Sequence, residues 1–148
     1  MAGLADFAAL VPLDHGLCVV VTRRRDLTAH TSVVNAGVVR HPVTSVESVA
    51  FVSVSSTRKL INLRLDPTVV VVIRAGWQWV SVEGRASLVG PDDPEPGVDD
   101  EQLRLLLREI FSAAGGEHND WEEYDQTMAR ERRTGVFVAP QRVFSQLE

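Results

Sequence analysis

Lys59 is the single lysine of this 148-residue chain, and it lies among residues that could bind an anion. The other 14 of the 15 basic residues are arginines, and one of these, Arg58, directly precedes Lys59. Ser56 and Thr57 stand before the pair and add two hydroxyl groups. Such a cluster could hold a phosphate by charge-assisted hydrogen bonds. The alternative is an ordinary Ser/Thr helix cap followed by two solvated basic residues.

The elements on either side of this cluster would position it. The alternating run 49–54 predicts a strand, and Leu60, Leu63 and Leu65 follow at near-helical spacing. A strand, a hydroxyl-rich turn and a helix start present backbone N–H groups and the positive end of a helix dipole. We therefore predict a phosphate site at residues 56–59, on a helix that ends at Asp66-Pro67.

The remaining pattern predicts mostly strands. Strands are expected at 17–21, 29–39 with a break at Asn35-Ala36-Gly37, 68–74, 77–89, 135–139 and 142–144, with Pro140 separating the last two. Helices are expected near 4–11, 99–113 and 120–131. Because the helices come late and lie between antiparallel strands, the order indicates an α+β or mostly β barrel rather than βαβ units.

Composition excludes several classes of protein. Apolar residues make up 45% and charged residues 24% of the sequence, as in ordinary globular domains, and we expect one domain over residues 1–148. A formal charge of -5 argues against non-specific nucleic-acid binding. No apolar run is long enough to span a membrane, and residues 1–13 carry Asp6 without a cation, unlike a signal peptide. We expect a cytoplasmic protein without a membrane partner.

Other reactive residue types form no recognisable constellation. Cys18 lies in the apolar run 17–21 and is predicted to be a buried structural thiol. The histidines, His15, His30, His41 and His118, have no metal-ligand spacing, and no metal is predicted. His118-Asn119-Asp120 is interpreted as a helix entry rather than a cation site.

Two further features have open or ordinary interpretations. The acidic loop 92–100 has no calcium-loop pattern and is predicted to be a solvated connection. Trp77 and Trp79 are predicted to share one strand face, either as a stacking platform or as core or interface aromatics.

The chain therefore has a candidate phosphate site without an obvious catalytic acid, base or metal. That combination suits an enzyme whose cofactor carries the chemistry, or a binding protein without catalysis.

The order of these segments resembles the pyridoxamine-phosphate-oxidase-like split β-barrel family. The resemblance lies in residues 55–67, the Val-rich strand after them, and the Val-Ser-Val-Glu-Gly-Arg-Ala strand at 80–86. Residues 25–28 and 30–37 match the front half of the family. The back half, residues 118–125, 131–133 and 140–144, is similar to the branch that uses the 8-hydroxy-5-deazaflavin coenzyme F-420.

The resemblance implies a homodimeric split β-barrel that binds its cofactor between subunits. It implies that the cofactor phosphate is contacted by Arg58 and Lys59, with Ser56, Thr57 and Asn62 nearby. It also implies that the ring system of the cofactor lies along Ser32, Val34 and Asn35. The implied reaction is hydride transfer from reduced deazaflavin to a conjugated small-molecule acceptor, with biliverdin or a related tetrapyrrole as one candidate. An FMN-dependent enzyme is the runner-up, and a non-catalytic flavin or haem binding protein is the third alternative.

Two observations bear on cofactor and assembly. Trp79 stands near the place where FMN oxidases of the family carry a glutamine, which favours deazaflavin. The anionic tail of deazaflavin needs cations, which the turn 23–25, or Arg40 with His41, could supply; the turn could equally be a solvated hairpin tip. Exposed strand edges and strand-borne tryptophans predict burial against a second copy of the chain.

Overall fold

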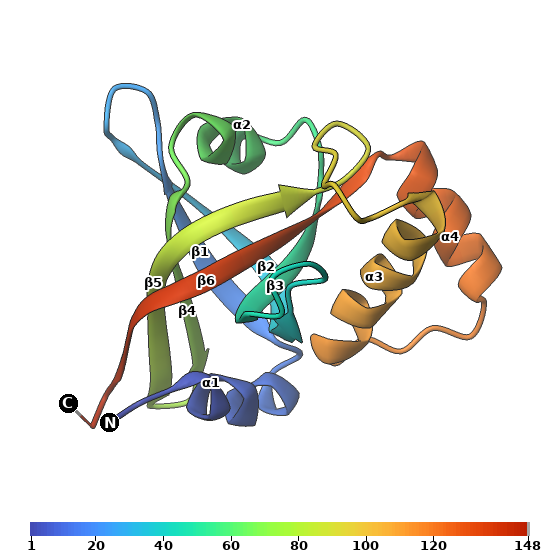
Figure 1. Cartoon of the computed structure of the whole chain (residues 1–148). Helices are drawn as coiled ribbons and strands as arrows, with labels where there is room; N and C mark the ends of the chain where they lie inside the picture. Colours follow the sequence, from blue (N-terminus) through green and yellow to red (C-terminus); the bar gives the residue numbers. More distant parts are fainter. Residues whose placement is uncertain (148) are drawn as a thin grey trace.

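Six antiparallel strands close into a barrel in the order β1-β2-β3-β6-β5-β4 (Figure 1). The computed structural model describes residues 1–147. The strands are β1 (Leu17–Arg23), β2 (Ala29–Arg40), β3 (Glu47–Val54), β4 (Thr68–Ala75), β5 (Gln78–Val89) and β6 (Arg133–Ser145). The helices are α1 (Leu4–Leu10), continued by a 3-10 turn η1 (Val11–Leu13), and α2 (Arg58–Leu65), α3 (Asp100–Ala113) and α4 (Trp121–Arg130). The predicted fold class is confirmed.

Two predicted strand breaks are wrong. β2 runs without interruption through Asn35-Ala36-Gly37, and Gly37 is required there for packing rather than for a turn. A Cβ at Gly37 would lie 2.3 Å from the Ala113 carbonyl oxygen, so the end of α3 can approach β2 only over a glycine. β6 likewise continues through Pro140, because the register shift between Glu83 and Gly84 on β5 accommodates the residue.

The barrel closes on itself, so the expected exposed strand edges are absent from the described part of the chain. β1 pairs with β4 as well as with β2, and every named strand has two neighbours. What the barrel does expose is an apolar outer face formed by β1, β2 and β4. Val19 pairs with Val33 on β2 and with Val72 on β4, and Val19 and Val33 are 42% and 64% exposed.

The helices cover the barrel at different places (Figure 1). α1 lies at one end and places the fully buried Phe7 in the core, and α2 lies at the other end and inserts Leu60 and Leu63. α3 and α4 lie beside the barrel, where Ile110 and Leu106 form a second apolar cluster with Phe137. No helix within residues 1–147 is long and apolar enough to cross a membrane.

Cys18 is buried as predicted, and burial raises the pKa of its thiol to about 12. The tryptophans do not share a strand face. Trp77 is 95% exposed in the turn before β5, whereas Trp79 packs edge-to-face on Phe144 with ring centroids 6.1 Å apart. Neither tryptophan belongs to the lining of the two cavities described below.

Candidate functional site

A cavity of about 680 Å³, here called the helix–barrel cavity, separates one side of the barrel from α3 and α4. Its barrel wall comes from β2 and β3, its floor from the start of α2, and its helical wall from the end of α3 through α4. The lining includes Val33, Val34 and Asn35; Val52, Ser53 and Val54; Thr57 and Lys59; Ile110, Phe111 and Ala114; and His118, Glu123, Tyr124, Thr127, Met128 and Arg133. The cavity thus combines apolar walls with a similar share of polar and charged groups, which could orient a small-molecule ligand.

Lys59 is the cation of the cavity floor. Burial, followed by the charge of Arg133, lowers the pKa of its ammonium group. Its Nζ lies 3.5 Å from Ser53 Oγ, and no carboxylate of the described residues forms an ion pair with it. A half-buried lysine without a counter-ion is suited to bind an anionic ligand.

Thr57 is the N-cap residue of α2, but its side chain does not cap the helix. The hydroxyl donates to the Val54 carbonyl at 3.0 Å and lies 3.1 Å from Ser53 Oγ. The ordinary Ser/Thr cap, which was the alternative for this segment, is therefore not formed. The backbone N–H groups of the first turn of α2 remain oriented towards whatever binds there.

Arg58 and Lys59 point into different cavities. Arg58 lines a second cavity of about 520 Å³, here called the arginine-turn cavity, together with Arg24, Arg25, Asp26, Ile61, Asn62 and Leu65. Arg24, Arg25 and Arg58 form no ion pair with a carboxylate among residues 1–147. Asp26 lines the same cavity, where its carboxylate accepts from the N–H and the hydroxyl of Thr28 and forms no ion pair with these arginines among the described residues.

Two buried polar atoms on β2 lack a hydrogen-bond partner among the described residues: His30 Nδ1 and Ser32 Oγ. The pKa of His30 is lowered first by burial and then by the charges of Arg24, Lys59 and Arg58. His30 is therefore within electrostatic range of cations that line both cavities. Buried polar groups without partners are rare in folded proteins and are often found at ligand sites. The arrangement fits a bound phosphate near the start of α2.

The other predicted phosphate residues are placed differently. Asn62 is buried, and its Nδ2 donates to Thr22 Oγ1 on β1 at 3.1 Å, which anchors α2 to the barrel. Ser56 is exposed and is not part of either cavity lining. Val34 and Asn35 line the helix–barrel cavity as expected for ring contacts, whereas Ser32, a half-buried residue whose Oγ is buried, is not part of the lining.

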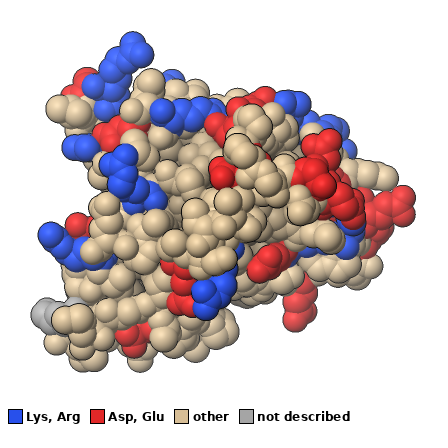
Figure 2. Space-filling view, in the orientation of Figure 1, with Lys and Arg blue, Asp and Glu red and all other residues tan. Residues whose placement is uncertain are grey.

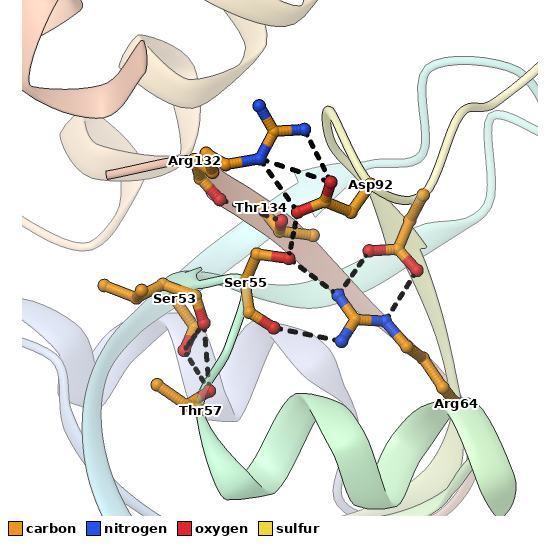
Figure 3. A network of polar contacts seen from close by, with 9 residues as sticks. Ser53, Ser55, Thr57, Arg64, Asp92, Arg132 and Thr134 are labelled. Carbon is orange, nitrogen blue, oxygen red and sulfur yellow. Dashed lines mark hydrogen bonds and ion pairs between the residues drawn. The ribbon is translucent and has the colours of Figure 1, made fainter. Parts of the chain in front are cut away.

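The acidic loop is not simply solvated, because it holds the turn before α2 in place (Figure 3). Ser55 donates from Oγ to Asp92 Oδ2 at 2.6 Å, and Arg64 donates to both the carbonyl and the hydroxyl of Ser55 at 3.0 and 2.9 Å. Arg132 binds the same Asp92 carboxylate. The hydrogen bonds from Arg132 and Ser55 lower the pKa of Asp92 to about 2.

The charges of the molecule are unevenly distributed (Figure 2). Acidic side chains are most numerous over α3 and α4, where Arg104 and Arg108 are paired with carboxylates, and basic side chains are prominent on the opposite side. Arg24 and Arg25 lie in the turn after β1. The net charge of -5 therefore coexists with a local cationic region around the start of α2. Such a region attracts anions locally although the whole protein is acidic.

Sequence reasoning missed several residues of the cavity. Ser53 could have been found, because alternation along β3 places it on the inner face with Phe51. His30, which lies outside the lining, carries no recognisable signal either, since only the structure shows that its Nδ1 is buried without a partner among the described residues. His118, Tyr124 and Arg133 come from the helical layer and the start of β6, and only the packing of α3 and α4 brings them to the cavity.

No model of a known protein family matches the sequence. Solved structures do match. The conserved hypothetical protein Rv2991 from Mycobacterium tuberculosis superimposes with a TM-score of 0.69 at 21% identity, over 98% of this chain and 84% of that protein. An F420 reductase matches with a TM-score of 0.60 at 14% identity, over 90% of this chain and 93% of that protein.

A pyridoxamine 5'-phosphate oxidase-related, FMN-binding protein from Nostoc punctiforme matches with a TM-score of 0.62 at 12% identity. That alignment covers 96% of this chain and 78% of the other. The chain has the split-barrel fold of these proteins. The fold predicted from the order of segments is thereby confirmed, and it is a fold used by proteins named for flavin-type cofactors.

Proposed function

We propose that this protein is an oxidoreductase that binds reduced deazaflavin, the F-420 type of coenzyme, in the helix–barrel cavity. The observation that carries the proposal is Lys59, a half-buried lysine in the cavity floor without a carboxylate partner among the described residues. It stands at the start of a helix whose N-cap hydroxyl is turned away. A cofactor phosphate would complete both features.

In this proposal the barrel wall and the cavity floor have different tasks. Val34 and Asn35 contact the cofactor ring, while Lys59 and Thr57 hold its phosphate next to Arg58. When bound, the reduced cofactor supplies a hydride. The residues of the chain orient the two reactants and exclude water between them, which is how a cofactor enzyme contributes to rate. The acceptor is a conjugated small molecule, with a tetrapyrrole such as biliverdin as one candidate.

Deazaflavin is favoured over FMN by the arginine-turn cavity. The longer anionic tail of deazaflavin extends beyond its first phosphate, and Arg24, Arg25 and Arg58 supply cations without ion-pair partners within residues 1–147. FMN ends at its phosphate and has no use for this second cavity. FMN remains the alternative cofactor, since the contacts at Lys59 would serve either molecule.

We further propose that the protein works as a homodimer. The apolar outer face around Val19, Val33 and Val72 is the surface that a second copy would cover. Exposed apolar patches rarely remain uncovered in soluble proteins. In this arrangement each cofactor touches both chains, because Val33 belongs to that face and also lines the helix–barrel cavity.

The deciding experiment is a calorimetric titration of the purified protein with F-420 and FMN side by side, over a series of salt concentrations. We expect tighter binding of F-420, with a preference that shrinks as salt screens the exposed arginines. Turnover of reduced F-420 with a panel of conjugated acceptors then separates an enzyme from a carrier. Equal or tighter FMN binding throughout would make FMN the cofactor, and binding without turnover would indicate a carrier.

A further inference from the structure

His118 presents a single, defined hydrogen-bond donor to the helix–barrel cavity. It precedes α4, and its Nδ1 accepts the backbone N–H of Asp120 at 3.0 Å. Because Nδ1 is an acceptor in this bond, the neutral ring carries its hydrogen on Nε2. From the sequence, residues 118–120 are interpreted as a helix entry. Asp120 is the residue that caps α4, because its side chain accepts the Glu123 N–H at 3.1 Å, so the His118 ring is not needed as the cap.

Aromatic packing holds the imidazole in place. Its centroid lies 5.7 Å from that of Tyr124, 6.0 Å from that of Trp121 and 6.3 Å from that of Phe111. A Cβ at Gly116 would approach the Phe111 ring to 2.6 Å, so only glycine allows Phe111 to pack over this loop. A ring confined in this way loses little entropy when it binds a ligand, which favours a specific contact.

The Nε2 edge of His118 faces the cavity. Glu123 Oε2 lies 3.3 Å from Nε2, and both residues line the cavity. The Glu123 side chain is 60% exposed, so a ligand oxygen that approaches Nε2 competes for this donor with a solvated carboxylate. The neighbouring phenol is turned away, because Tyr124 donates to the Leu107 carbonyl at 2.9 Å.

The helical wall therefore offers His118 Nε2–H to whatever lies between it and the barrel wall. Thr127, also in the lining, donates its hydroxyl to Glu123 Oε1 at 3.2 Å. In the proposed function the cofactor ring lies along Val34 and Asn35, so the acceptor lies on the side of His118. The oxygen of that acceptor is the group that a neutral N–H donor recognises.

We propose that His118 Nε2–H binds the carbonyl oxygen of the conjugated acceptor. This inference rests on the proposed function. Hydride addition forms a C–H bond at the β-carbon and breaks the C=C π bond, and the electron pair moves to the carbonyl oxygen. The reduced cofactor is the two-electron donor. The hydrogen bond from Nε2 stabilises the oxygen as its negative charge grows.

The same geometry excludes His118 as the source of the second hydrogen. The neutral ring has one hydrogen, and its loss would leave an anionic imidazolate beside Glu123. The α-carbon therefore takes its proton from water. His118 binds and stabilises the acceptor oxygen, and it does not transfer a proton to the product.

The test is an NMR titration of ¹⁵N-histidine-labelled protein, with and without oxidised F-420. The probe is cyclohex-2-enone, and cyclohexene is the matched probe without an oxygen. The His118 signals are assigned from their loss in His118→Phe. We expect an Nε2–H tautomer whose Nε2 signal shifts with the enone and stays in place with cyclohexene. His118→Gln keeps a donor near the same position and should bind the enone within about threefold of the wild type. His118→Phe keeps ring packing and should bind about tenfold more weakly, the loss of one hydrogen bond.

The outcomes separate this inference from the proposed function. An enone-dependent Nε2 shift without F-420 binding supports the His118 assignment and removes the proposed cofactor. F-420 binding without any Nε2 shift, or equal enone binding by His118→Phe and the wild type, overturns the His118 assignment and leaves the cofactor proposal standing. An Nδ1–H tautomer also overturns it.

Discussion

Arg64 and Asp93 form a two-point ion pair that joins α2 to the loop after β5. Nε donates to Oδ1 at 2.8 Å and Nη2 donates to Oδ2 at 2.7 Å. The same guanidinium binds Ser55, so one side chain links the acidic loop, the turn and the helix that carries Lys59 (Figure 3). Such bidentate pairs give geometric precision as well as energy. The pair thus positions the proposed phosphate site without contacting a ligand.

The first prediction concerns this link and pH. Asp92 has a pKa of about 2 in the folded protein, below the value of roughly 3.9 for an unfolded chain. Its contribution to stability is therefore present above about pH 4 and is lost as the pH falls towards 2. In Asp92→Asn, urea unfolding should show a lower stability at pH 7 and a smaller loss between pH 4 and 2. The exposed Glu109→Gln is the control, and an unchanged acid slope in Asp92→Asn would contradict the assignment.

The second prediction concerns the cofactor phosphate. Removing Lys59 deletes a charge-assisted hydrogen bond of roughly 1.5–3 kcal/mol, so Lys59→Ala should weaken F-420 binding by about tenfold or more. Circular dichroism should show an intact fold. Arg74→Ala removes an arginine near the end of β4 whose guanidinium donates to the Gly76 carbonyl, and this variant should bind F-420 like the wild type. Unchanged affinity in Lys59→Ala, Arg58→Ala and the double variant would refute the site.

The third prediction concerns the anionic tail. Arg25 lines the arginine-turn cavity without an ion pair to any carboxylate in residues 1–147. Arg25→Gln should weaken F-420 binding several-fold at low salt and leave FMN binding unchanged, since only deazaflavin reaches this cavity. The difference should disappear at high salt. Arg85→Gln serves as the charge-matched control, and an equal loss for both cofactors would place the tail elsewhere.

The fourth prediction concerns assembly. Val33 is 64% exposed on the apolar outer face, and a buried aspartate there would be costly. Light scattering should give a dimer for the wild type and a monomer for Val33→Asp at micromolar concentration. Val43→Asp, in the loop before β3, should remain dimeric. A monomeric wild type with full cofactor affinity would rule the dimer out.

The fifth prediction concerns the contact between β2 and α3. Gly37→Ala would place its Cβ 2.3 Å from the Ala113 carbonyl oxygen, a backbone atom that cannot turn aside. Overpacking of this kind costs about 1–3 kcal/mol and should lower the urea midpoint. Because the end of α3 forms part of the cavity, F-420 binding should fall as well. Gly3→Ala meets no atom within 4 Å and should change the midpoint little.

The sequence by itself determined the elements and their order. Alternation identified the strands and the spacing of Leu103, Leu106 and Leu107 identified α3, because the burial periods of strands and helices are local properties. Asp66-Pro67 ended α2 as predicted. The barrel followed from the order of these segments and from the resemblance they carry. Lys59 and Thr57 were singled out from residue type alone, and both line the helix–barrel cavity.

Only the tertiary structure decided which side chains share a site. Arg58 and Lys59 are neighbours in sequence, yet consecutive residues on a helix point in different directions, so they enter different cavities. Asn62 lines the arginine-turn cavity with Arg58, and only the structure shows that its Nδ2 also donates to Thr22 and so anchors α2 to the barrel. His118 reaches the cavity because α3 and α4 pack beside the barrel over Gly37, a contact between distant segments that no local pattern encodes.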